Sequence, residues 1–193
     1  MDKRTKLINQ IVNGEYLMFC RIPGAYPITS QESEKGFRLA RASVFASWSE
    51  ATLESYAQDI AEGMRAGRNF MTEKYARMDD LMPPINTNPL VEKIADMEAN
   101  WQQEVRAKYP LLLKEKQEAP SDGSSENPSF LKYLQSELET YSDRTLESYW
   151  QDISVACDEE RNLAEEKYLK MVQRLGHDSI EDYERSLAAE QPE

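Results

Sequence analysis

The chain has 193 residues, of which 40% are hydrophobic and 30% are charged, as in soluble globular proteins that bury a sizeable core. Its net charge of -12 excludes nucleic acids and anionic membranes as main partners, because both would repel it. Only 7 residues are glycine, and no apolar run approaches a membrane span or a signal core, so we expect a helical, cytoplasmic protein.

The first predicted helix lies in "LINQIVNGEYLMF", residues 7–19, where Ile8, Ile11 and Met18 recur at helical spacing. Glu15 falls in the middle of this apolar stripe. A carboxylate there must be paired or must keep its proton, since burial without a partner raises the pKa of an acid by about 3–5 units. Glu15 is therefore a candidate for a structural ion pair or for a functional site.

Two more predicted helices follow the stretch "RIPGAYPITSQESEKG", which is rich in helix breakers. The earlier helix carries Phe37, Val44 and Trp48 on one face. The later helix begins at Ser49, a suitable N-cap. Its apolar face consists of Leu53, Tyr56, Ile60, Met64, Met71, Tyr75 and Met78.

After the divider "MPPINTNP", the chain repeats itself. Shifted by 93 positions, Trp48–Met78 lies on Tyr141–Met171, and 15 of the 31 pairs are identical, which indicates an internal duplication. The match continues upstream without a gap as far as Phe37. A shift of 83 then pairs Glu15 with Glu98, which again lies in the middle of an apolar stripe.

The second half has its own boundary signals. Its first helix is predicted to begin with Asn88 as the cap and Pro89 at the first helical position. The stretch "EAPSDGSSENPS" is predicted to be a mobile linker. The tail "EDYERSLAAEQPE" is expected to form a short helix or to fray.

The fold class predicted from this pattern is all-α. We expect one helical domain over residues 1–193, built as a pseudo-twofold bundle of two tandem three-helix repeats with about six main helices. The first repeat covers about residues 5–80, the second about 88–175, and the tail 178–193. Each repeat alone would bury little apolar surface, which favours packing of the two repeats face to face.

The buried glutamates leave three interpretations open. In the first, Arg68 and Arg161, at the edge of the apolar face of the third helix, reach inward and form structural ion pairs with the glutamates. Tyr56 and Tyr149 add hydroxyl groups to these pairs. Alternatively, the same side chains form a central polar site with acid–base or ligand-binding roles. In the third interpretation, the helix phase is misjudged. The candidate catalytic residues are Glu15, Glu98, Tyr56, Tyr149, Arg68 and Arg161.

A second polar set recurs on the opposite face of the third helix. A solvated face tolerates most polar residues, so identity in both copies favours docking on other helices or on a partner. Asp59 and Asp152 lie near the flank and are predicted to bind Lys or Arg of a neighbouring helix. The candidate binding residues are Gln58, Asn69, Glu73, Gln151, Asn162 and Glu166.

Signals for metals and cofactors are absent from the sequence, so we predict no metal site and no cofactor. The one histidine, His177, is expected at the surface or at a helix cap, and no Glu-x-x-His motif exists. No phosphate-binding glycine loop, nucleophile elbow or calcium loop is present. Cys20 and Cys157 are predicted to be reduced core residues, with a disulfide or a reactive thiol as alternatives.

Three stretches carry a family resemblance: "EYLMF" at Glu15–Phe19, "LESYAQDI" at Leu53–Ile60 and "GRNFMTEKYARM" at Gly67–Met78. Together with the later "YSDRTLESY", the chain resembles the bacterial domain-of-unknown-function family 4125 over most of its length. The resemblance implies a helical protein of the bacterial cytoplasm and supplies no activity.

Two hypotheses for the function follow. The first is a non-enzymatic interaction or accessory module that binds a protein partner or itself through the repeated polar face. The second is an enzyme or a small-molecule-binding protein with a carboxylate, tyrosine and arginine site between the two repeats.

Overall fold

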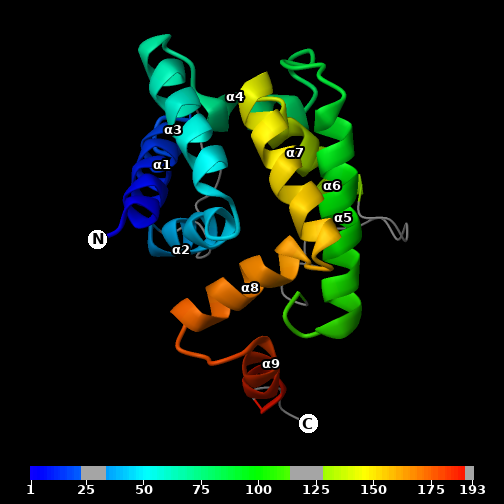
Figure 1. Ribbon diagram of the computed structural model, residues 1–193. Coiled ribbons are helices and arrows are strands. Elements are labelled where there is room, and N and C mark those ends of the chain that lie inside the picture. Colours follow the sequence, from blue (N-terminus) through cyan, green and yellow to red (C-terminus); the bar gives the residue numbers. More distant parts are fainter. Residues whose placement is uncertain (23–33, 114–127, 190–193) are drawn as a thin grey trace.

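The computed structural model describes residues 1–22, 34–113 and 128–189, which form nine α-helices and no β-strand (Figure 1). This arrangement confirms the prediction of an all-α fold. The helices are α1 (Lys3–Phe19), α2 (Glu34–Phe45), α3 (Glu50–Arg65), α4 (Phe70–Met78), α5 (Leu90–Lys108), α6 (Pro128–Leu138), α7 (Asp143–Asp158), α8 (Leu163–Arg174) and α9 (Ile180–Ala189).

The expected count of about six helices is wrong for the described parts of the chain, mainly because each long third helix is two helices. Gly67, between α3 and α4, has φ of +73°, and Glu160, between α7 and α8, has φ of +54°. In both places the next backbone N–H donates to the carbonyl five residues earlier at 2.8 Å. This hydrogen bond closes the helix end and turns the chain.

Asn69 and Asn162 start the helices that follow these breaks. Each side-chain oxygen accepts a hydrogen bond from the backbone N–H three residues later, at 3.1 Å for Asn69 and 3.0 Å for Asn162. Each amide nitrogen donates to a carbonyl of an earlier helix, at 2.8 Å to Met18 and 3.2 Å to Trp101. The two asparagines therefore fasten α4 to α1 and α8 to α5.

The predicted serine caps are confirmed. Ser49 and Ser142 each accept a hydrogen bond from the backbone N–H three residues later at 3.3 Å. Asn88 Oδ1 accepts from the N–H of Leu90 at 2.9 Å. The helix α5 starts at Leu90, one residue later than predicted, so Pro89 precedes the first helical residue.

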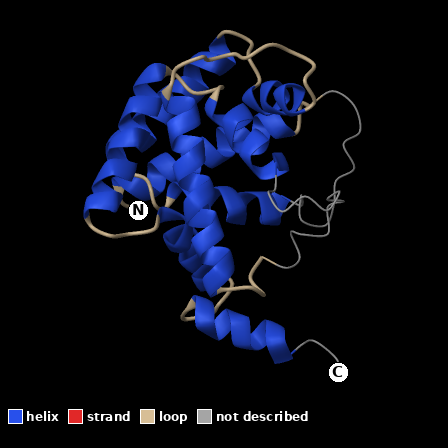
Figure 2. Ribbon diagram, turned by 90° about the vertical axis from the view of Figure 1, so that its right-hand side faces the viewer, coloured by secondary structure: helices blue, strands red, loops and turns tan. Residues whose placement is uncertain are grey.

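The helices pack in two groups, and the second helix of each group also contacts a helix of the other group. In the first group α1 lies against α2, α3 and α4, and in the second α5 lies against α6, α7 and α8 (Figure 1). The helix α2 also contacts α8, α6 also contacts α4, and α3 contacts α7. At one end of the molecule, α9 lies against α8 (Figure 2).

Aromatic rings join the two groups at the centre. The Trp48 ring lies 4.7 Å from the Tyr149 ring and 6.0 Å from the Tyr141 ring, measured between centroids. The Tyr56 and Tyr141 rings are 4.5 Å apart. All four side chains are at most 3% exposed. The core is therefore continuous across both groups of helices.

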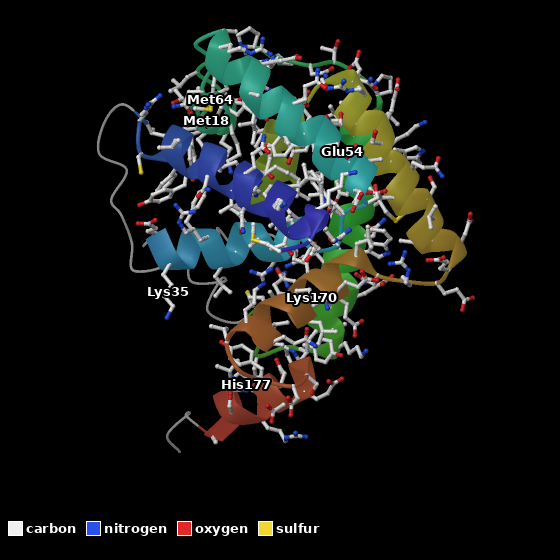
Figure 3. All side chains as sticks on the ribbon, turned by 60° about the vertical axis from the view of Figure 1, so that its left-hand side comes forward. Met18, Lys35, Glu54, Met64, Lys170 and His177 are labelled. Atoms are coloured by element: carbon white, nitrogen blue, oxygen red, sulfur yellow. The ribbon has the colours of Figure 1, made fainter. Side chains whose placement is uncertain are left out.

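The prediction that the cysteines lie in the core is wrong. Cys20 and Cys157 are exposed free thiols. Cys157 lies in the last turn of α7, and Met64 lies in the corresponding turn of α3. Met64 is also exposed (Figure 3). In α3 the buried position in this turn is Gly63, because the Phe70 ring of α4 packs directly against it.

Several predicted segments lie at the edges of the described residues. Most of "RIPGAYPITSQESEKG" and of the expected mobile linker "EAPSDGSSENPS" falls outside them. The tail forms the expected short helix, α9, whose last residue is Ala189. His177 lies between α8 and α9 with its Nδ1 3.1 Å from Asp182 (Figure 3). None of the helices in the described ranges is both long and apolar enough to cross a membrane.

Candidate functional site

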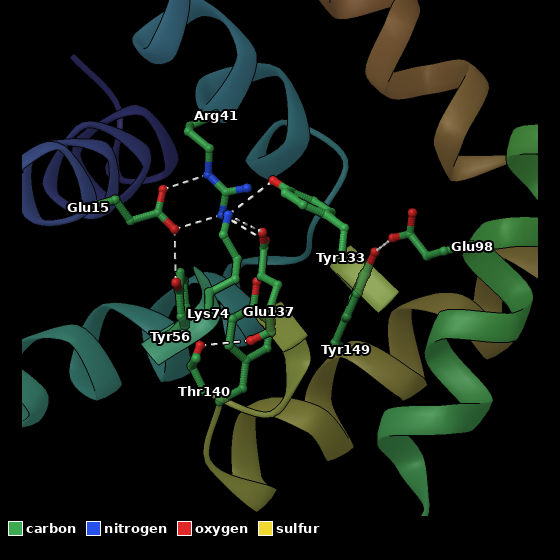
Figure 4. Close-up of polar contacts among 10 residues, drawn as sticks. Glu15, Arg41, Tyr56, Lys74, Glu98, Tyr133, Glu137, Thr140 and Tyr149 are labelled. Carbon is green, nitrogen blue, oxygen red and sulfur yellow. Dashed lines mark hydrogen bonds and ion pairs between the residues drawn. The ribbon is translucent and has the colours of Figure 1, made fainter. Parts of the chain in front are cut away.

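Glu15 lies in a sealed ion pair. Its side chain is 0% exposed, and Arg41 of α2 donates to both of its carboxylate oxygens, at 2.7 and 2.6 Å. The Tyr56 hydroxyl donates to the same carboxylate at 2.8 Å. Figure 4 shows these three side chains converging. The structure thus has the expected buried ion pair and tyrosine at Glu15, although the cation is Arg41 and not Arg68.

The ion pair extends into a buried network. Arg41 also donates to Glu137 of α6 at 2.9 Å, and Lys74 of α4 donates to the second oxygen of Glu137 at 3.1 Å. Tyr141 donates to Glu137 at 3.0 Å, and Lys74 also donates to the hydroxyl of Tyr133 at 3.1 Å. Burial favours the protonated form of Glu137, but Arg41 and Lys74 outweigh it and hold its pKa well below the usual range. The network therefore sets the two carboxylates of Glu15 and Glu137 against the two cations Arg41 and Lys74.

The predicted inward arginines instead point to the surface. Arg68 pairs with Glu73 at 2.6 Å, and Arg161 pairs with Glu166 at 2.7 Å. Both arginines are exposed. Each arginine directly follows the residue at which the helix breaks. The side-chain direction expected for one continuous helix therefore does not apply to it. This corrects the expectation that Arg68 and Arg161 lie beside the buried glutamates.

Glu98 has surroundings different from those of Glu15. Tyr149 donates a hydrogen bond to it, as Tyr56 does to Glu15 (Figure 4). Glu98 is half-buried and forms no ion pair with a described residue. The position that corresponds to Arg41 at the shift of 93 is Leu134. Burial raises the pKa of Glu98, against the opposing charge of Lys167.

Glu98 and Lys167 line a pocket of about 330 Å³ between α2, α5, α6, α7 and α8. Its volume falls at the lower end of the range for small-molecule sites. The buried ion pair of Arg41 and Glu137 borders it. Apolar and aromatic side chains supply most of the remaining wall. They are Ala40, Val44, Trp48, Ile94, Phe130, Tyr133, Leu134, Leu138, Tyr141, Tyr149, Tyr168 and Met171.

Two donors in this pocket lack a described acceptor. Lys167 forms no hydrogen bond or ion pair with a described residue, and its Nζ lies 5.0 Å from the centroid of the Tyr168 ring. Burial disfavours the ammonium of Lys167, but Tyr168 and Glu98 outweigh burial and raise its pKa. Trp48 is 2% exposed, and its indole N–H has no partner among the described residues. Buried polar groups normally have partners, so the indole N–H of Trp48 is an exception that lies at the pocket.

Most of the candidate binding residues form contacts within the chain. Asn69 and Asn162 cap helices, while Glu73 and Glu166 pair with the neighbouring arginines. Gln58 is exposed and donates to Glu62 at 2.7 Å. Gln151 is exposed as well. The two glutamines are therefore the members of this set most open to a partner.

Asp59 and Asp152 join α3 to α7. Asp59 accepts hydrogen bonds from the N–H of Ser142 at 3.0 Å and from the hydroxyl of Thr145 at 2.6 Å. Asp152 accepts the corresponding two hydrogen bonds from the start of α3, at 2.9 and 2.7 Å. Each aspartate therefore supports the start of the other helix, where the helix dipole favours a negative charge. Among the described residues, the expected lysine or arginine partner is found for Asp59, at 3.8 Å from Arg144, and none is found for Asp152.

Sequence reasoning missed Arg41, Lys74, Glu137, Lys167 and Trp48. A signal existed for the lysines, because Lys74 and Lys167 are identical at the shift of 93. Arg41 and Glu137 have no such match and are brought together by the packing of α2 near α6. Within the described ranges, no group of three or more His, Cys, Asp or Glu side chains could hold a metal ion.

The chain belongs to the family described as "Protein of unknown function (DUF4125)", whose model matches residues 5–185. No curated protein and no solved structure matches it.

Proposed function

We propose that this member of the family binds a small molecule in the pocket around Glu98 and Lys167. The observation that supports this most is the difference between the surroundings of Glu15 and Glu98. Glu15 is paired with Arg41. Glu98 faces a mostly apolar pocket and forms no ion pair with a described residue. Charged groups in such a pocket are costly unless they are paired, so Glu98 is a candidate for pairing with a ligand.

We also infer that the molecule is two tandem repeats related by a pseudo-twofold axis. The first covers about residues 5–80 and the second about 88–175, followed by the tail 178–193, in one domain over 1–193. The matching sets of helix contacts around α1 and α5, and the reciprocal hydrogen bonds of Asp59 and Asp152, support this arrangement. On this view the glutamate of the first repeat is enclosed in a polar network, and the corresponding glutamate of the second repeat lies in a pocket.

The setting we propose is the bacterial cytoplasm. The free thiols of Cys20 and Cys157 support a reducing compartment.

The test is to fill the pocket. Ala40 lines the pocket and is exposed, so Ala40→Trp adds bulk there without removing a buried side chain. A fragment set screened by NMR on labelled protein should shift the signals of Glu98, Tyr149 and Lys167 in the wild type, and should lose this effect in Ala40→Trp. The matched control is Ala51→Trp on exposed α3 surface, which should keep it. A wild type whose pocket signals respond to no fragment would refute the proposal.

A second candidate function, docking on a protein partner or on a second copy of the chain, is favoured by one observation. Gln58 and Gln151 are identical in the two halves and exposed in both. The double variant Gln58→Arg and Gln151→Arg should then lower the mass seen in sedimentation without lowering the melting temperature. An unchanged monomeric mass in both proteins would rule out self-association through this face.

A further inference from the structure

We propose that the ligand carries a guanidinium, amidinium or protonated amine that binds Glu98 in the place that Arg41 takes at Glu15. This inference rests on the proposed function, and it names the chemical class of the ligand.

The two carboxylates differ in their hydrogen-bond partners. Glu15 accepts two hydrogen bonds from one guanidinium and a third from Tyr56. Glu98 accepts the tyrosine hydrogen bond from Tyr149, but Leu134 stands where the arginine would be. A carboxylate has about four acceptor positions, so Glu98 has free ones that face the pocket. A planar cation that donates two parallel hydrogen bonds matches them best.

The walls of the pocket carry aromatic rings. Aromatic rings of Trp48, Tyr133 and Tyr149 line the same pocket as Glu98. The faces of such rings attract cations. Around Glu15 the same chemistry is visible, because the guanidinium of Arg41 lies 4.9 Å from the centroid of the Phe45 ring. A cationic group can therefore be bound by charge and by ring faces together.

Two donors at the pocket indicate what the other end of the ligand carries. Lys167 and the indole N–H of Trp48 have no acceptor among the described residues, and a cationic head group does not supply one. The ligand therefore has a second end that is a carboxylate or a carbonyl. With a carboxylate at this second end the ligand is a zwitterion, and with a carbonyl this end is neutral. The cation of the ligand binds Glu98, and its acceptor binds Lys167.

Calorimetry with four small probes tests this. Benzamidine, benzamide and benzoate share a ring and differ in charge, and 4-amidinobenzoate carries both end groups. We expect benzamidine to bind more tightly than benzamide and benzoate, and 4-amidinobenzoate to bind most tightly. Glu98→Gln should weaken benzamidine about tenfold to a hundredfold, the effect of losing charged hydrogen bonds. Lys167→Met should remove only the added affinity of 4-amidinobenzoate.

The outcomes separate the two proposals. Benzoate that binds more tightly than benzamidine, with loss in Lys167→Met, would overturn the cationic ligand and leave the pocket as a binding site. No heat from any of the four probes, together with no fragment response in the pocket, would overturn both. Where a variant does not fold, the wild type suffices, because benzamidine should weaken as falling pH protonates Glu98.

Discussion

Glu15 and Glu98 each accept a hydrogen bond from a tyrosine, and only Glu15 also faces an arginine. The apolar stripes predicted that both carboxylates are at least partly buried, and the repeat predicted their tyrosines. The stripes could not identify Arg41, because its contact with Glu15 depends on how α2 packs on α1. Nor does the repeat reveal it, since Leu134 replaces it.

This difference predicts opposite effects of the same substitution. Glu15→Gln leaves the buried Arg41 without one of its two counter-charges and should lower the free energy of unfolding by about 3–5 kcal/mol. Glu98→Gln removes a partly buried charge that forms no ion pair with a described residue, and should leave the free energy of unfolding unchanged or raise it. Urea unfolding at pH 7 measures both, and a comparable loss in the two variants would contradict this account.

The raised pKa of Glu98 also predicts a pH dependence. Its ordinary value is 4.5, and burial raises it in the folded chain despite Lys167, with Glu137 adding to the rise. Between pH 4.5 and the folded pKa, the folded protein binds more protons at this site than the unfolded protein, so stability falls as pH rises through this range. The melting temperature of Glu98→Gln minus that of the wild type should therefore be larger at pH 7 than at pH 4.5. A difference that grows toward acid pH would be inconsistent with a raised pKa.

At the scale of elements, the helical periodicity located the first helices and their serine caps correctly, and failed at the two breaks. Gly67 is a recognisable helix terminator, but the corresponding Glu160 is not. Glutamate adopts a positive φ there because the chain must turn to place α8 against α5. Tertiary packing therefore decides the second break, and this is why the position of Arg161 could not be predicted.

The two breaks give a pair of substitutions with opposite signs. Gly67→Ala places a side chain at φ of +73° with no contact to compensate, and should destabilise the protein by about 1 kcal/mol. Glu160→Gly relieves the same strain at φ of +54° and should stabilise it by up to about 1 kcal/mol. Thermal unfolding of both variants measures this, and destabilisation by Glu160→Gly would mean that its side chain makes contacts that outweigh the strain.

At the scale of the whole molecule, two different polar environments lie where the two groups of helices meet. One is a buried network, drawn from both groups, in which Glu15 and Glu137 are balanced by Arg41 and Lys74. The other is a pocket that holds Glu98 and Lys167. The sequence predicted the duplication itself, and the pocket follows from places where the copies differ, such as Leu134. Positions that are identical at the shift of 93 do not reveal such differences.

Leu134→Arg tests this account most directly, because it restores the arginine that the first half has. Its guanidinium should fill the pocket and bind Glu98, with Leu134→Met as the control of similar volume. We predict that the melting temperature of Leu134→Arg is higher than that of the wild type by about 2–4 °C for each kcal/mol gained, and that benzamidine raises it no further while still raising that of the wild type. A Leu134→Arg protein that melts at a lower temperature and is stabilised by benzamidine as the wild type is would contradict the account.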